Sequence, residues 1–228
     1  MGDMVEFASN GNTAGGYLAV PDSGSGPGVV VIQEWWGLNQ QIKEVCDRYA
    51  GEGFVALAPD LYHGESTTEP DEAGKLMMAL NIERAAKDMV GAVDDLGDHD
   101  AVTSAGVGVT GFCMGGGLAL WLATLRPERI KAVVPYYGII PWPAAQPDWS
   151  VLRAKVQGHY AENDEFASPE EVAKLEGELR GLGKDVEFFT YPGVEHAFTN
   201  HHRPEVFHED HSDTAWQRTV EFLRANVT

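Results

Sequence analysis

Residues 107–117 constrain the fold more than any other stretch of the chain. They read Val-Gly-Val-Thr-Gly-Phe-Cys-Met-Gly-Gly-Gly, and a strongly helix-forming segment follows over residues 118–123. A β-branched run that ends in Gly-x-Cys-x-Gly before a helix predicts a strand, a sharp turn and a helix, with Cys113 at the turn. Glycines are expected at 111 and 115 because side chains there would collide with the strained residue between them.

Cys113 is therefore a candidate nucleophile. The helix after it would direct its N-terminal N–H groups and positive dipole end toward the sulfur, which favours the reactive thiolate. The alternative interpretation is a small buried cysteine beside a tight strand–helix turn. The other cysteine, Cys46, lies on the apolar face of an expected helix and is interpreted as a core residue.

The rest of the chain alternates expected strands with expected helices. Besides the strand before Cys113, strands are expected at residues 4–8, 15–20, 28–33, 54–58, 130–137, 155–160 and 186–190. Besides the helix after Cys113, which ends near residue 125, helices are expected at residues 40–52, 71–80, 82–96, 169–182 and 213–225.

This alternation predicts the α/β class: a mainly parallel twisted sheet with helices on both faces and no large cap. A turn at residues 9–12 joins the first two strands, and residues 138–148 are expected to form an irregular loop. Because no repeat or composition break divides the chain, we expect residues 1–228 to form one domain. Ligands of such sheets bind at the carboxyl ends of the strands, where Cys113 falls.

Two polar segments follow expected strands at this same edge of the sheet. One carries Glu162, Asp164 and Glu165, and the other carries His196. A thiol nucleophile needs a base and the base needs an orienting acid, which follow it in the order acid, histidine in folds of this kind. We predict that Asp164 is the acid and His196 the base. Glu162 and Glu165 are alternatives, and a turn or helix N-terminal carboxylate is the structural interpretation of Asp164.

Acyl transfer also needs two backbone donors for an oxyanion. The turn would supply the N–H of Met114, and the loop after the strand at residues 28–33 would supply the N–H of Trp35. The neighbouring Glu34 is an acidic residue at the end of a buried strand. It is therefore expected either to be solvated in a cleft or to have a functional role at the site.

Aromatic residues gather near the same edge of the sheet. They are expected to line a substrate pocket, with simple core positions as the alternative. These residues are Trp35, Trp36, Tyr136, Tyr137, Trp142 and Phe198.

The charge of the chain is strongly acidic. Lys and Arg number 16 and Asp and Glu number 35, so the formal net charge at pH 7 is −19. Such a surface repels nucleic acid and anionic membranes, so we expect neither as a partner, and we expect a monomer or a small homo-oligomer acting on a small molecule. No apolar run approaches the ~20 residues of a membrane span. With no visible signal peptide and two cysteines, a cytoplasmic location is expected.

Four of the eight histidines crowd the polar segment after His196. They are His201, His202, His208 and His211. Because no metal-ligand spacing such as His-Glu-x-x-His is present, they are interpreted as surface or loop residues, and neither a metal nor a cofactor is expected.

Six motifs, spread in order over nearly the whole chain, together resemble the dienelactone hydrolase (carboxymethylenebutenolidase) family of α/β hydrolases. They lie at residues 33–39, 58–62, 111–116, 136–138, 162–164 and 195–198. The resemblance implies an α/β-hydrolase fold and a Cys–His–Asp triad at Cys113, His196 and Asp164. It also implies that Glu34 contacts the resting cysteine and takes up its proton when substrate binds, which would protect the thiol from oxidation.

The chain departs from the family where the substrate is expected to bind. The resemblance implies arginines that hold a substrate carboxylate, but Asn200 stands four residues after His196 and residues 64–80 contain no arginine. Lys75, Arg84 and Arg203 are the remaining candidates for that role.

The expected function is therefore hydrolysis of an ester or a dienelactone-type lactone through a thioester acyl-enzyme. Two alternatives stay open. One is a carboxylesterase or thioesterase for uncharged substrates, and the other is a non-catalytic binding or redox-sensing protein.

Overall fold

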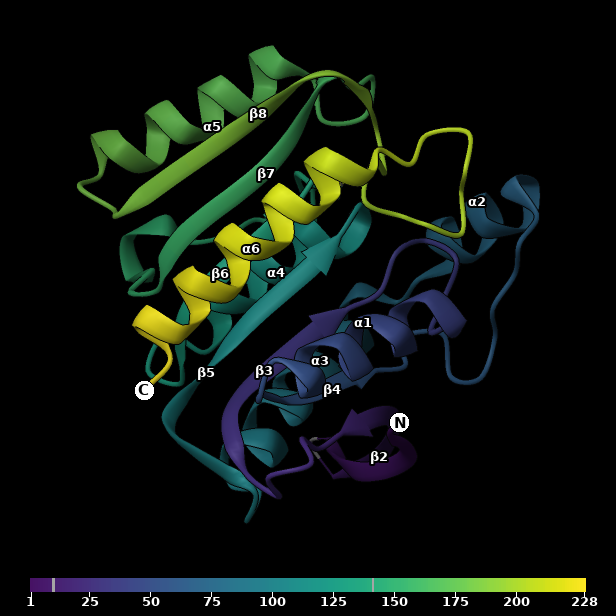
Figure 1. Cartoon of the computed structure of the whole chain (residues 1–228), viewed down its shortest axis with the longest axis vertical. Helices are drawn as coiled ribbons and strands as arrows, with labels where there is room; N and C mark the ends of the chain where they lie inside the picture. Colours follow the sequence, from purple (N-terminus) through teal and green to yellow (C-terminus); the bar gives the residue numbers. More distant parts are fainter. Residues whose placement is uncertain (10, 141) are drawn as a thin grey trace.

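The computed structural model describes residues 1–9, 11–140 and 142–228. Its eight strands form one sheet in the order β1-β2-β4-β3-β5-β6-β7-β8 (Figure 1). The strands are β1 (Asp3–Ser9), β2 (Asn12–Ala19), β3 (Gly26–Ile32), β4 (Val55–Pro59), β5 (Val102–Phe112), β6 (Ile130–Tyr136), β7 (Lys155–Asn163) and β8 (Val186–Glu195). The helices are α1 (Gln40–Gly51), α2 (Pro70–Ala79), α3 (Ile82–Gly97), α4 (Met114–Leu125), α5 (Pro169–Gly181) and α6 (Glu209–Asn226).

The sheet is mainly parallel, as the sequence predicts. Strands β3 to β8 pair in parallel, and only the hairpin of β1 and β2 runs antiparallel at one edge. Successive residues of β3 face opposite sides of the sheet: Val29 and Val31 belong to one core, and Val30 and Ile32 to the other. This explains the continuous apolar run, because both faces of the strand are buried.

Helices cover both faces of the sheet (Figure 1). Helices α1 and α6 pack on one face through residues such as Tyr49 and Trp216, and α3, α4 and α5 pack on the other through residues such as Met89 and Leu118. Cys46 is fully buried in the first of these cores, as expected. The α/β class with helices on both faces is therefore confirmed.

Several expected boundaries differ in the structure, among them those of β7, β8 and α6. Strands β7 and β8 run on to Asn163 and Glu195, past a register shift between Ala161 and Asn163, so the two polar segments begin inside the sheet. Helix α6 begins at Glu209, four residues early, because the ring of His208 accepts the N–H of His211 and caps the helix. Asn10 of the expected first turn lies outside the described residues.

In the part of the chain that the structure describes, no helix is both long and apolar enough to pass through a lipid bilayer.

Two mid-helix glycines have opposite surroundings. A Cβ at Gly91 of α3 would lie 2.5 Å from the carbonyl oxygen of Ala8 in β1, whereas a Cβ at Gly177 of α5 would meet no described atom beyond its own helix within 4 Å. We expect Gly91→Ala to lower the free energy of unfolding by about 1–3 kcal/mol through overpacking. We expect Gly177→Ala to raise it by about 0.5–1 kcal/mol through helix propensity. Chemical denaturation of both variants measures the difference, and changes of the same sign would contradict this packing.

Candidate active site

Cys113 occupies a strained backbone turn between β5 and α4. Its φ and ψ are 56° and −123°, a region that residues with a Cβ rarely adopt. Its N–H donates to the carbonyl of Tyr136 at 3.0 Å, and its own carbonyl accepts the N–H of Gly116 at 3.0 Å. These two hydrogen bonds hold the turn, so the thiol stands at the carboxyl edge of the sheet where α4 begins.

The glycines around Cys113 permit close contact between backbone segments. A Cβ at Gly111 would overlap the carbonyl of Gly115, and a Cβ at Gly115 would overlap the carbonyls of Gln33 and Ile32. The expectation that these side chains would strike the residue between them is therefore wrong in detail, because the collisions are with the backbone of α4 and of β3.

His196 and Asp164 form a buried pair beside the thiol. Nδ1 of His196 lies 2.8 Å from Oδ2 of Asp164. The other carboxylate oxygen accepts the N–H groups of Phe166 at 2.8 Å and Ala167 at 2.9 Å. The side chain of Asp164 is fully buried, so these three donors compensate its lost hydration. Among the three acidic candidates of this loop, the structure brings Asp164 to the histidine.

The other two carboxylates of the loop lie elsewhere. Glu162 accepts the N–H of Gly193 at 2.8 Å on the surface, and Glu165 is exposed. Both therefore remain solvated rather than paired with His196.

The ionisation of His196 is set by its two neighbours. Burial disfavours the charged ring, but the hydrogen bonds and negative charges of Asp164 and Cys113 outweigh burial and raise the pKa of His196 to about 10. Nε2 of the ring is buried on the side of the Cys113 thiol and, apart from that sulfur, has no hydrogen-bond partner among the described residues. Nδ1 is therefore fixed by its hydrogen bond to Asp164, while Nε2 remains available to exchange a proton with the thiol or a substrate.

Glu34 is fully buried, but it is not bound to the thiol. Its Oε1 accepts the hydroxyl of Tyr137 at 3.2 Å, and its Oε2 accepts the amide of Asn200 at 3.0 Å. Burial raises the pKa of Glu34, and the nearby positive charge of His196 and these two hydrogen bonds oppose the rise. Among the described residues no hydrogen bond joins Glu34 to Cys113, in contrast to the contact that the family resemblance implies.

Asn200 is a site residue that sequence reasoning passed over. It is buried, and while Nδ2 donates to Glu34, its Oδ1 accepts the backbone N–H of His202 at 3.0 Å. Its place four residues after His196 was the available signal, but only as the absence of an arginine. The structure shows that the amide positions the buried carboxylate of Glu34.

The two expected oxyanion donors flank the same cavity as the thiol. Met114 is the first residue of α4, so its N–H has no intrahelical acceptor. The N–H of Trp35 has no acceptor within the described part of the chain. The thioether of Met114 accepts the hydroxyl of Tyr62 at 3.4 Å, which holds the side chain of Met114 against Tyr62.

A cavity of about 390 Å³ opens above Cys113, Met114 and His196. Trp35 and Tyr137 line it as expected, and Met77, Ile139, Ile140 and Phe166 make its wall mostly apolar. Two charged residues, Glu171 and Arg203, also line it.

The other expected pocket residues do not line this cavity in the described structure. Trp36 is buried and packs edge-on against Trp35, with ring centroids 4.9 Å apart. Phe198 is fully buried against the ring of Tyr137, and Trp142 is half-buried against the hydrophobic core. Tyr136 is fully buried in the core, with its hydroxyl 2.6 Å from that of Thr219. These four side chains support the pocket wall or the core, so the core alternative holds for them.

Backbone strain is concentrated around the thiol. Four described non-glycine residues have positive φ, and three of them are Cys113, Tyr137 and Ala197. Tyr137 lines the cavity and Ala197 follows the histidine, so the strained positions surround the proposed reaction centre.

The whole chain is similar to known proteins of one family. The model of the "Dienelactone hydrolase family" matches residues 14–227. "Protein usf" from Aquifex pyrophilus is 42% identical over 234 residues, with all of both chains covered. A "Putative carboxymethylenebutenolidase" from Aquifex aeolicus is 37% identical over 230 residues, 98% of each chain. The crystal structure of a "Putative Dienelactone Hydrolase" from Klebsiella pneumoniae superposes with a TM-score of 0.85 at 27% identity, covering 98% of this chain and 99% of that one.

The raised pKa of His196 makes the stability of the folded protein depend on pH. Because the folded pKa of about 10 exceeds the ordinary histidine value of 6.5, the pairing stabilises the fold fully below pH 6.5 and less as pH rises through about 10. Titration of the imidazole by NMR is expected to show the high pKa in the native protein. Asp164→Asn is expected to lower the pKa, because it removes a charge and a strong acceptor. Equal pKa values in the two proteins would contradict this origin of the shift.

Proposed function

Because the chain belongs to the dienelactone hydrolase family and is a hydrolase of ester or lactone bonds, we propose that it acts through a Cys113–His196–Asp164 triad and a thioester acyl-enzyme. The observation that carries this proposal is the shared cavity. Cys113 and His196 line one mostly apolar cavity, and Nδ1 of His196 lies 2.8 Å from Oδ2 of Asp164. A nucleophile, a base and an orienting acid in this order are the groups that acyl transfer requires.

In the first half of the reaction, the Cys113 thiolate attacks the carbonyl carbon of the substrate. The electron pair of the C=O bond moves to oxygen, and the amides of Met114 and Trp35 stabilise the oxyanion. As the tetrahedral intermediate collapses, the bond to the leaving oxygen breaks and His196 donates its Nε2 proton to that oxygen. The products are a thioester on Cys113 and a free alcohol or enol, which in a lactone stays part of the same molecule.

In the second half, neutral His196 accepts a proton from water at Nε2. The resulting hydroxide attacks the thioester carbonyl, and the same two amides stabilise the second oxyanion. Collapse expels the Cys113 thiolate and releases the carboxylic acid product. His196 is then protonated and Cys113 is a thiolate, as they were immediately before the attack on the substrate, so no proton is gained or lost by the enzyme.

Glu34 acts in this scheme through charge rather than contact with sulfur. Its buried carboxylate lies close enough to His196 for the two charges to interact, while Tyr137 and Asn200 hold it in place. When Glu34 is ionised, its negative charge near His196 favours the imidazolium that forms when the thiol or a water is deprotonated.

The cavity favours Arg203 as the group that recognises a substrate carboxylate. Arg203 lines the cavity, whereas Lys75 pairs with Glu72 at 2.6 Å on exposed α2 and Arg84 lies beside His63 at 3.1 Å. A dienelactone-type substrate would place its lactone carbonyl at Cys113 and its carboxylate toward Arg203.

The second candidate is hydrolysis of uncharged esters or thioesters. The cavity wall is mostly apolar, and Nε of Arg203 is already paired with Glu205 at 2.8 Å. An uncharged acyl group would bind this wall without breaking that pair.

We further infer that residues 1–228 work as one domain in the cytoplasm, as a monomer or small homo-oligomer. Both cysteines are free, which suits a reducing compartment. The net charge of −19 favours well-dispersed molecules and disfavours nucleic acid and anionic membranes as partners.

Replacing the nucleophile tests the proposed chemistry directly. Cys113→Ala is expected to abolish hydrolysis of an activated aryl ester, whereas Cys46→Ala, which removes the other thiol from α1, is expected to retain activity while folded. Mass spectrometry of the quenched native enzyme is expected to show an acyl group on Cys113. Full activity of Cys113→Ala would overturn the mechanism.

Removing the cavity arginine separates the two substrate classes. Arg203→Gln is expected to lower kcat/KM for an anionic lactone by at least about tenfold, the effect of losing about 1.4 kcal/mol of charge-assisted binding, while kcat/KM for a neutral ester of similar size changes little. Arg153→Gln is the matched control, because Arg153 pairs with Glu128 at 2.7 Å on the surface and does not line the cavity. Equal effects on both substrates would assign the neutral class.

A further inference from the structure

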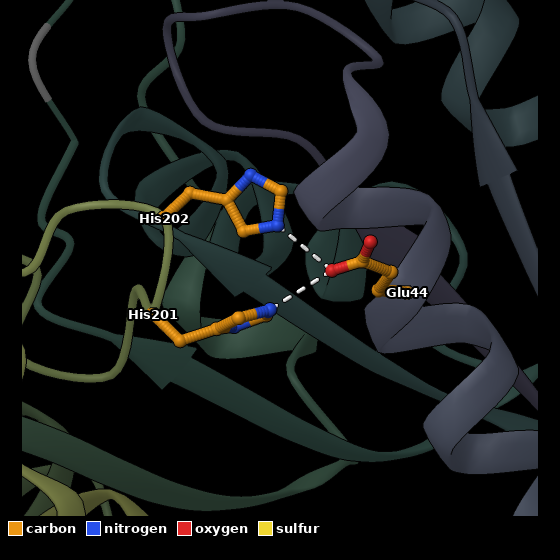
Figure 2. A group of neighbouring side chains, drawn as sticks. All are labelled: Glu44, His201 and His202. Atoms are coloured by element: carbon orange, nitrogen blue, oxygen red, sulfur yellow. Dashed lines mark hydrogen bonds and ion pairs between the residues drawn. The ribbon is translucent and has the colours of Figure 1, made fainter.

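A cluster of metal-ligating side chains lies outside the catalytic cavity. Glu44 comes from α1, and His201 and His202 come from the loop after β8, with both rings directed at the carboxylate (Figure 2). None of the three lines the described catalytic cavity, and the proposed reaction uses none of them. The cluster therefore needs an explanation of its own.

The ligand atoms converge closely. Oε2 of Glu44 lies 2.8 Å from Nε2 of His201 and 2.8 Å from Nε2 of His202, and all three atoms lie within 4.8 Å of one another. Two imidazole nitrogens and one carboxylate oxygen are the protein ligands of an open zinc site, in which water takes the fourth position. Imidazole-rich sites of this kind suit divalent first-row transition metals rather than Ca²⁺ or Mg²⁺.

Supporting contacts orient two of the three ligands. Oε1 of Glu44 accepts the amide of Gln40 at 3.1 Å, one helical turn earlier, which fixes the plane of the carboxylate. The backbone N–H of His202 donates to Asn200 at 3.0 Å, which fixes the start of that side chain. Outer contacts of this type hold ligands in place in known metal sites.

Access and charge both favour a cation here. The side chains of Glu44, His201 and His202 are 37%, 49% and 40% exposed, so an ion can enter and keep bound water. The two neighbouring arginines are paired elsewhere, Arg48 with Asp213 at 3.3 Å and Arg203 with Glu205 at 2.8 Å. The strongly acidic chain as a whole also attracts cations.

We propose that Glu44, His201 and His202 bind one divalent transition metal ion, with Zn²⁺ the best match, and that the ion ties the loop after His196 to α1. In the structure each ring donates Nε2–H to the carboxylate. To coordinate a metal each ring must offer the lone pair of Nε2, so the Nε2–H proton leaves that nitrogen, either for Nδ1 of the same ring or for solvent. The tie would also restrain Asn200, which joins His202 to Glu34.

Zinc titration of the full chain tests the site. Isothermal titration calorimetry with ZnCl₂ is carried out on the Cys113→Ala protein, so that the active-site thiol is not a competing ligand. We expect one Zn²⁺ per chain. Adding Glu44→Gln or His202→Gln is expected to weaken the Kd by at least about tenfold, since even the loss of an outer contact has an effect of that size. His211→Gln, which removes another histidine of the same segment, is expected to leave the Kd unchanged.

Thermal unfolding with and without zinc provides the second measurement. At one fixed zinc concentration, zinc is expected to raise the Tm of the Cys113→Ala protein and of the His211→Gln control, and to raise the Tm of the Glu44 and His202 variants by clearly less. Without zinc, all variants are expected to melt cooperatively, because the altered side chains are at least partly exposed. Absence of zinc binding, or an equal Kd in the cluster variants and the control, would overturn the proposal.

Discussion

The close packing of three backbone segments around Cys113 is the constraint on which the rest of the site depends. Gly115 lies against the end of β3, Gly117 lies against Ile139, and Gly138 lies against the carbonyl of Cys113 itself. No side chain fits between these segments, so α4 starts directly above the sheet and the residue at the turn keeps a positive φ. Strain of this kind persists only where surrounding structure enforces it, and here it presents the thiol to the cavity.

Buried charge is the second constraint. The side chains of Glu34 and Asp164 are buried and that of His196 is 14% exposed, and an unpaired charge in such surroundings would be costly. Each has defined partners: two backbone amides and a ring for Asp164, a hydroxyl and an amide for Glu34. The polar groups that acyl transfer needs are thus oriented before substrate arrives, which is the condition for electrostatic stabilisation of a transition state.

The segment from His196 to Arg203 connects these features. It carries the proposed base, then Asn200 on the buried carboxylate, then the two histidines that face α1, and finally the arginine that lines the cavity. One stretch of chain therefore contributes to proton transfer, to the position of Glu34 and to the cavity wall. The same stretch is attached to α1 through the hydrogen bonds of His201 and His202 to Glu44.

Local pattern was enough to predict the order of strands and helices, the strained turn at Cys113, and the arrival of acid and histidine at the same sheet edge. These features follow from hydrophobic period, glycine placement and the shared direction of parallel strands. Only the tertiary structure decided which distant side chains meet. Glu34 is hydrogen-bonded to Tyr137 and Asn200, and Glu44 to His201, which is 157 residues away in the sequence. The side chain of Phe198 is buried in the core rather than lining the cavity. Periodicity acts over a few residues, whereas these contacts depend on the sheet order and the path of the loops.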